Sequence, residues 1–163
     1  MELHRNWNDI KSVFNDSFKS SVHFAIATVG QQGEPHVTPI GSLILTNPGY
    51  GFYFEKYTRQ LPCNLALNNR VCVLAVNSSR WFWLKSLAKG RFGIPPAIRL
   101  QGRVKHLRPA TDHEISLWQK RVHQLRFTKG HMLMWRNMDM VRDIEFDSIE
   151  PVHIGKMTNG LWE

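Results

Sequence analysis

The sequence has no apolar run long enough to cross a lipid bilayer, which takes about 20 consecutive apolar residues. Residues 1–11, MELHRNWNDIK, also lack the continuous apolar stretch of a signal peptide. These two absences predict a cytoplasmic protein with no membrane partner.

Cysteine is scarce, and so are the patterns that hold metal ions. The two cysteines, Cys63 and Cys72, do not form a Cys-x-x-Cys motif, so we expect free thiols in a reducing compartment. The eight histidines are scattered singly, with no close pair at helical or strand spacing. No metal site is therefore predicted.

Common catalytic motifs are missing as well. The chain has no Gly-x-Ser-x-Gly, no glycine-rich loop ending in Gly-Lys-Ser/Thr, no His-Glu-x-x-His and no Gly-x-Gly-x-x-Gly. These absences argue against the standard hydrolase, kinase and Rossmann classes.

What the chain does contain is the composition of an ordinary globular protein. It has 163 residues, 42% of them hydrophobic and 21% charged, which predicts one domain spanning residues 1–163. The formal net charge of +8 makes a polyanionic partner worth considering. The basic residues are dispersed, however, and fit either a pocket for a phosphorylated small molecule or a solvated surface.

The apolar pattern changes from helical to alternating after an opening helix. Thr111 and Glu114 have the spacing of a capping box at a later helix start. Residues 81–96, WFWLKSLAKGRFGIPP, break the pattern and are interpreted as an inserted helix or lid. The expected helices are 7–18, 61–69 and 111–124, and the expected strands are 24–29, 36–45, 52–54, 71–76, 97–107 and 141–154.

These strands predict an antiparallel sheet. Connections of about six residues are too short for a parallel crossover, which predicts a meander for the first three strands. Residues 71–76 are apolar throughout and predict a strand buried on both faces, whereas 97–107 alternate as a strand with one wet face does. The expected class is β-rich α+β, with the strands forming a barrel or a pair of sheets.

The corner after the third strand has the outline of a phosphate site. Lys56, Thr58 and Arg59 lie between the strand and a helix that has Pro62 in its first turn. A strand-to-helix corner offers free backbone N–H groups, and a hydroxyl and a guanidinium beside them would complete an anion cradle. Plain surface charges would give the same pattern.

Six pieces of the chain together resemble the pyridoxamine 5'-phosphate oxidase family, the FMN-binding split barrels. The likeness runs from about Phe24 to Leu107 and depends on the order and spacing of the pieces. They are Ala27-Thr-Val29, Gly33-Glu-Pro-His-Val-Thr-Pro39, Phe52-Tyr-Phe54, Arg59 to Asn64 with Leu65, Asn68-Asn-Arg-Val71 and Leu100-Gln-Gly-Arg-Val104.

The resemblance implies an antiparallel split β-barrel with peripheral helices, which binds FMN in a cleft between the subunits of a homodimer. It implies that the second and third strands border the flavin, that Arg59 and Gln60 grip its phosphate, and that Arg99 approaches the cofactor. With Lys56 and Thr58 from the corner after the third strand, the predicted cofactor-binding residues are Thr38, Ile40, Phe54, Glu55, Lys56, Thr58, Arg59, Gln60 and Arg99.

The chain departs from this family at two places. The usual phosphate-binding pattern is Ser-Arg-Lys, whereas a gapless alignment from Asn68 places Arg59-Gln60-Leu61 there. A one-residue shift aligns Arg59 with the family's arginine and Gln60 with its lysine, and Lys56 is then the substitute cation. The C-terminal arginine and tryptophan segment of the oxidase is not recognisable, so pyridoxal phosphate synthesis is not predicted.

The predicted function is that of an FMN-dependent oxidoreductase that moves a hydride or electrons between a reductant and an unknown small molecule. Such a protein needs no catalytic acid or base of its own, because the flavin carries the chemistry. Two alternatives stay open: a non-catalytic protein that binds a flavin, a deazaflavin or haem, and a nucleic-acid-binding protein on a barrel scaffold. The 81–96 segment either contacts the flavin and an anionic ligand or packs between subunits.

Overall fold

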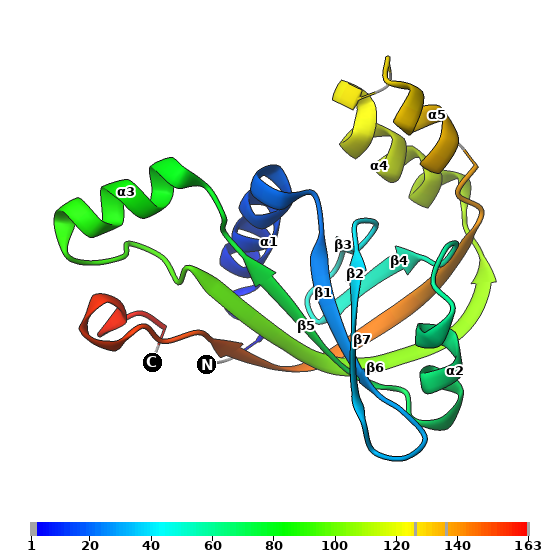
Figure 1. Ribbon diagram of the computed structural model, residues 1–163, viewed down its shortest axis with the longest axis horizontal. Helices are drawn as coiled ribbons and strands as arrows, with labels where there is room; N and C mark the ends of the chain where they lie inside the picture. The colour runs from blue at the N-terminus through cyan, green and yellow to red at the C-terminus, as the bar shows by residue number, and fades with distance from the viewer. Residues whose placement is uncertain (1–2, 126, 136, 163) are drawn as a thin grey trace.

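The computed structural model describes residues 3–125, 127–135 and 137–162, so Met1, Glu2, Arg126, Arg136 and Glu163 of the predicted domain lie outside the described residues. Seven strands form one antiparallel sheet, with one helix packed against a face of it and the others at its ends and edges (Figure 1). The strands are β1 (Phe24–Val29), β2 (Pro35–Ile40), β3 (Ile44–Leu45), β4 (Tyr50–Phe54), β5 (Arg70–Val76), β6 (Ala97–Pro109) and β7 (Met140–Pro151). The helices are α1 (Trp7–Ser21), α2 (Gln60–Leu67), α3 (Arg80–Lys89), α4 (Asp112–Val122) and α5 (Lys129–Met134), with the 3-10 turns η1 (His123–Leu125) and η2 (Gly155–Thr158).

The sheet order is β2-β1-β5-β6-β7-β4-β3, and the sheet does not close on itself. The predicted class, a β-rich α+β fold of the split-barrel type, is confirmed. Both pairings of the predicted meander exist, β1 with β2 and β3 with β4, but β2 and β3 lie at opposite edges of the sheet. The predicted second strand is therefore divided between the two halves of the sheet, and the meander is not continuous.

The chain changes its pairing partner at residues 41–43, so the predicted strand 36–45 is two short strands. Ser42 causes the break by bonding to the end of β4: its hydroxyl donates to the backbone oxygen of Phe54 at 3.0 Å and accepts from the backbone nitrogen of Phe54 at 3.0 Å. These two bonds fix the end of β2 beside the end of β4.

The main core lies between α1 and the inner face of the sheet. Trp7, Ile10 and Phe14 of α1 are buried in one cluster with Ile26 of β1 and Val73 of β5. This apolar stripe of α1 is the one that its helical spacing predicts. Burying each such side chain contributes roughly 1.5–3 kcal/mol, so this contact fixes α1 against the sheet.

The other face of β1, β2 and β5 carries small and apolar side chains that are half-buried or exposed in the part of the chain that the structure describes. In β5 only alternate residues are buried, so the prediction of burial on both faces is wrong for the single chain. Leu74 lies opposite Ala25 and Cys72 lies opposite Ala27, and burial raises the pKa of the Cys72 thiol. We call this surface the outer sheet face; it comprises Ala25, Ala27, Val29, Val37, Pro39, Cys72, Leu74 and Val76.

Helix α4 is attached to the sheet by its first turn. The predicted capping box is confirmed: the Thr111 hydroxyl accepts from the backbone N–H of Glu114, and the Glu114 carboxylate accepts from that of Thr111. Arg108 of β6 donates to the carboxylates of both Glu114 and Asp143, with closest N–O distances of 2.6 Å. These contacts tie α4 to β6 and β7.

The segment predicted as an insertion forms α3, capped by Ser79 at its start and by Gly90 in the left-handed conformation at its end. Along the long axis of the molecule, α3 and α2 lie at opposite ends (Figure 1). Among the described residues, no helix combines the length and the apolar character that a membrane span requires.

Candidate functional site

A small pocket lies where the end of β2, the end of β4 and α4 meet. Its volume is about 190 Å³, and we call it the β2–β4 pocket. The Ser42 to Phe54 bonds bring two of its walls together, and α4 and α5 supply the third. Its lining is Pro39, Ile40, Gly41, Ser42, Phe54, Lys56, Tyr57, Thr58, Trp118, Met134, Trp135 and Met138.

Four of the predicted cofactor-binding residues line this pocket: Ile40, Phe54, Lys56 and Thr58. The rings of Phe54 and Trp118 lie 6.0 Å apart and form an apolar wall. Lys56 extends across the rim, where its ammonium donates to the backbone oxygen of Asn137. The pocket thus combines an aromatic wall with a cation and a hydroxyl at one end.

Two buried polar atoms stand out in this lining. The Thr58 hydroxyl oxygen and the Trp118 indole nitrogen are the two buried side-chain polar atoms without a hydrogen-bond partner among the described residues. Leaving such a group unpaired costs roughly 1–3 kcal/mol, so native proteins rarely do it without a ligand or water in place. Both atoms belong to residues that line the β2–β4 pocket.

Trp118 owes its position to the attachment of α4. It is 1% exposed and packs against Phe54 on one side and Trp135 on the other, at ring separations of 6.0 Å each. The Arg108 guanidinium lowers the pKa of Glu114 below its usual range, so Glu114 is ionised and pairs firmly at neutral pH. The indole N–H is therefore held in place before any ligand arrives.

Glu55 has a structural partner and does not line the pocket. Arg142 of β7 donates to both of its carboxylate oxygens, at 2.7 and 3.0 Å, and the Tyr53 hydroxyl donates to one of them at 3.2 Å. Burial and the Glu55 charge raise the pKa of Tyr53, which keeps that hydroxyl protonated. Glu55 fixes the strand end from which Lys56 and Thr58 project.

Arg59 and Gln60 begin α2 beside the pocket rather than in its lining. The first backbone N–H groups of an α-helix have no intrahelical partner, and in α2 no side chain caps them. Gln60 donates to the Asn64 side chain at 2.9 Å. Arg59 is exposed, and its guanidinium makes no hydrogen bond or ion pair within the part of the chain that the structure describes. Arg59 is thus available to an anion at this corner.

The structure does not bring Thr38 and Arg99 into this pocket. The Thr38 hydroxyl lies 3.3 Å from a ring nitrogen of His36 on the same strand. Arg99 donates to Glu150 at 2.8 Å beside the outer sheet face, in register with Leu74. Within one chain these two residues are therefore separate from the other predicted site residues.

Several lining residues were missed by sequence reasoning. Trp118 lies on a helix that the capping box predicts, but no sequence signal relates that helix to the end of β4 sixty residues earlier. The same holds for Met134, Trp135 and Met138, which line the pocket from α5 and the segment after it. Ser42 was interpreted as part of a continuous strand.

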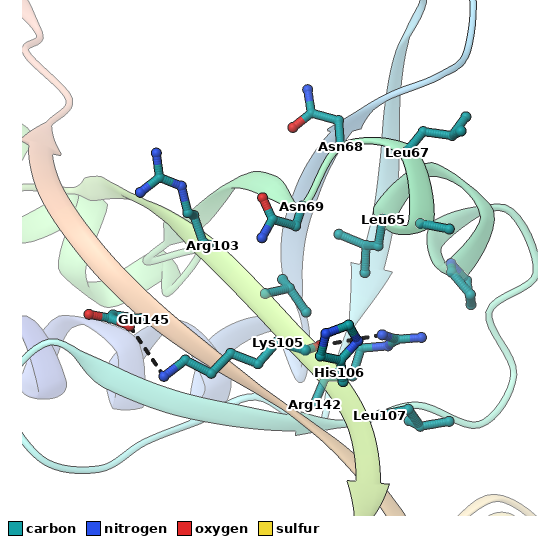
Figure 2. A pocket seen from close by; sticks show the side chains of 13 residues that line it. Leu65, Leu67, Asn68, Asn69, Arg103, Lys105, His106, Leu107, Arg142 and Glu145 are labelled. Atoms are coloured by element: carbon teal, nitrogen blue, oxygen red, sulfur yellow. Dashed lines mark hydrogen bonds and ion pairs between the residues drawn. The ribbon is translucent and has the colours of Figure 1, made fainter.

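A larger groove of about 980 Å³ lies on the other side of α2, between its end and β6 (Figure 2). Arg103, Lys105 and His106 give it a basic wall, but Lys105 pairs with Glu145 at 3.2 Å and Arg142 pairs with Glu55. None of the residues implied by the resemblance lines this groove. Because it also holds no unpartnered buried atom, we regard the smaller pocket as the site.

No three His, Cys, Asp or Glu residues within the described ranges are grouped closely enough to hold a metal ion. The β2–β4 pocket itself has no His, Cys, Asp or Glu in its lining. Its chemistry is that of a binding site with hydrogen-bond donors, an ammonium and aromatic surface.

The chain matches a known protein family in sequence. Residues 10–145 match the family model described as pyridoxamine 5'-phosphate oxidase. A search of curated proteins by sequence found no match.

Solved structures share the fold at low sequence identity, which shows the fold alone. An FMN-binding protein from Syntrophomonas wolfei subsp. wolfei is 11% identical, with 92% of this chain and 94% of that one covered and a TM-score of 0.55. A protein named F420 reductase is 13% identical, with 86% and 94% covered and a TM-score of 0.55. HutZ, the heme storage protein from Vibrio cholerae, is 13% identical, with 93% and 95% covered and a TM-score of 0.50.

Proposed function

Because this chain belongs to the pyridoxamine 5'-phosphate oxidase family, we propose that it binds FMN in the β2–β4 pocket and serves as a flavin-dependent oxidoreductase. The observation that carries the proposal is that two residues lining one pocket, Thr58 and Trp118, each have a buried polar atom without a partner among the described residues, Oγ1 and Nε1. A ligand with acceptor atoms at both ends would satisfy them. FMN is such a ligand, with phosphate oxygens at one end and ring oxygens and nitrogens at the other.

The phosphate end fits the corner that begins α2. Thr58 would donate its hydroxyl, the exposed Arg59 guanidinium would add a charge-assisted bond, and Lys56 would add a second cation from the rim. The uncapped N–H groups of α2 favour an anion at the same place. Gln60 stands where the family has lysine, so we assign the charge of that lysine to Lys56.

The ring end fits the aromatic wall. Phe54 and Trp118 offer apolar surface, and the Trp118 N–H would donate to a ring acceptor. When bound, the flavin supplies hydride and single-electron transfer. The chain itself would orient the ring and keep water from one of its faces, and the titratable side chains in the described lining are Lys56 and Tyr57.

The size of the pocket supports a homodimer with the cofactor at its interface. Sites that bury a drug-sized ligand have volumes of roughly 300–1,000 Å³. One chain provides about 190 Å³, so a second wall from a partner would be required. The outer sheet face, with Val29, Val37 and Val76 exposed and Leu74 half-buried, offers the apolar surface for that contact.

Binding of a deazaflavin or haem without turnover is the second candidate. It rests on the fold neighbours named F420 reductase and heme storage protein. The pocket lining favours a flavin over haem, because haem iron in proteins is most often held by His or Cys and neither lines the pocket. Nucleic-acid binding rests on net charge alone.

The proposal is tested by titrating the purified protein with FMN and following the visible absorption bands. We expect binding by the wild type and at least tenfold weaker binding by Arg59→Ala, because a hydrogen bond to a charged group contributes about 1.5–3 kcal/mol. Arg103→Ala removes the same charge from the α2–β6 groove and should bind FMN as the wild type does. No binding by the wild type would refute the FMN proposal, and oxidation of NADH or NADPH by the loaded protein separates an enzyme from a carrier.

A further inference from the structure

Helix α3 has an apolar surface that faces solvent. Trp81, Leu84 and Ala88 follow the i, i+3, i+7 spacing, which places them on one face of the helix, opposite the buried Ser86. Trp81 is 81% exposed and Leu84 is 58% exposed, and the neighbouring Leu87 is 59% exposed. We call Trp81, Leu84, Leu87 and Ala88 the α3 crest.

The helix that exposes these residues is held in place by contacts on its other side. On the inner side, Phe82 and Trp83 pack against Phe92 at ring separations of 5.5 and 5.3 Å. The Trp83 indole donates to the backbone oxygen of Asn77 at 2.7 Å, and the Ser86 hydroxyl donates to that of Phe82 at 2.8 Å. The inner aromatic residues are therefore fixed by packing, and the α3 crest is held outward.

Basic residues surround the crest, and the nearby carboxylate that the structure shows is Asp16 of α1, which lines one hollow with Ser79 and Phe82 at the start of α3 and pairs with Lys19. The sequence has no Asp or Glu between Glu55 and Asp112. Elsewhere in that stretch the basic side chains of Arg70, Arg99, Lys105 and Arg108 pair with carboxylates of β7. By contrast, Arg80, Lys85, Lys89 and Arg91 have no ion pair with any described residue.

We propose that α3 docks the protein onto the surface of an anionic lipid bilayer, with the crest at the level of the headgroups and the four cations facing the lipid charges. A helix with Trp and Leu on one face and Lys or Arg beside it is typical of this kind of binding. The position of α3 at one end of the molecule lets it reach a flat surface (Figure 1). The sequence predicted no membrane partner because its apolar runs are too short to span a bilayer. The length of apolar runs does not decide whether a protein binds to the surface of a bilayer.

The apolar part of the surface distinguishes lipid from nucleic acid. Phosphodiesters would use the four cations, and Trp81 can stack on a base, but the aliphatic Leu84 and Leu87 have no partner on a polynucleotide backbone. In a bilayer interface the same leucines leave water together with the indole. This inference is independent of the identity of the cofactor.

The test is co-sedimentation of the full chain with vesicles of phosphatidylcholine alone or mixed equally with phosphatidylserine. We expect binding to the mixed vesicles, weakened by added salt. Lys85→Gln with Lys89→Gln should lower the partition coefficient about fivefold for each residue. Lys120→Gln with Lys129→Gln, an equal charge change at exposed positions on α4 and α5, should bind as the wild type does.

The crest is tested separately with Trp81→Ser combined with Leu84→Ser, both exposed in the folded chain. This variant should keep the unfolding midpoint of the wild type and lose binding to the mixed vesicles. Equal binding of the wild type to neutral and mixed vesicles would overturn the proposal. So would a loss of duplex DNA binding or of self-association in the crest variant while vesicle binding is unchanged.

Discussion

Replacing Thr58 by valine should make the cofactor-free protein more stable and FMN binding weaker. Valine keeps the shape of threonine and removes the hydroxyl, whose oxygen is buried without a partner among the described residues. A buried unpaired hydroxyl costs about 1–3 kcal/mol, so we expect the free energy of unfolding of Thr58→Val to rise by about 1 kcal/mol. We use the lower end of this range because a water molecule can partly satisfy the hydroxyl in the cofactor-free protein.

The same change removes one charge-assisted bond to the FMN phosphate. Such a bond contributes about 1.5–3 kcal/mol, which corresponds to a rise in Kd of roughly 10- to 100-fold. Riboflavin has the same ring and no phosphate, so its weaker binding should be unaffected. A rise in the free energy of unfolding together with a loss of FMN affinity would show that the Thr58 hydroxyl contributes to ligand binding and not to stability.

The assay has two parts. Urea unfolding of the cofactor-free variant gives the change in stability, and fluorescence titration with FMN and riboflavin gives the two affinities. Thr46→Val makes the same substitution at a half-buried turn position outside the pocket and should change neither affinity. The reasoning is refuted if Thr58→Val destabilises the cofactor-free protein and binds FMN as the wild type does.

Further variants test the ring end, the attachment of α4 and the dimer. Trp118→Phe keeps an aromatic ring and removes the N–H, so it should weaken FMN and riboflavin by the same factor of about 5–10 in titrations, whereas an effect on FMN alone would contradict the assignment. Glu114→Gln should lower the free energy of unfolding at pH 7 by about 1–3 kcal/mol. The pKa of Glu114 is lower in the folded protein than in the unfolded chain, where it is about 4.3. The contribution of Glu114 to the free energy of unfolding is therefore complete above that pH and is lost as the pH falls through the lower folded pKa. The stabilities of wild type and variant, measured against pH, should converge in acid. Leu74→Glu places a charge on the outer sheet face and should give a monomer in light scattering that binds FMN poorly; a dimer with normal affinity would exclude that face as the interface.

Local signals in the sequence located several elements correctly. The strand Phe24–Val29 has the predicted bounds, since a continuous apolar run ends there in glycine and proline turn residues. The start of α4 was predicted by Thr111 and Glu114, because a capping box depends only on residues three apart. In each case the interactions that decide the structure lie within a few residues.

Pairings between segments far apart in the sequence could not be predicted from local signals. The break after Ile40 depends on the bonds from Ser42 to Phe54, and the pairing of β4 with β7 joins segments about ninety residues apart. The pocket shows the same limit. Thr58 was suggested by the cations and hydroxyl of the strand-to-helix corner, whereas Trp118 reaches the site because α4 packs against β4 and is tied to the sheet by Arg108.

A crystal structure of the protein grown with FMN tests the central proposal most directly. The account predicts a dimer in which the FMN phosphate lies within hydrogen-bond distance of Thr58 Oγ1 and Arg59, and the isoalloxazine ring lies within hydrogen-bond distance of Trp118 Nε1. FMN bound in the α2–β6 groove, or a β2–β4 pocket that stays free of it at saturating FMN, would contradict the account.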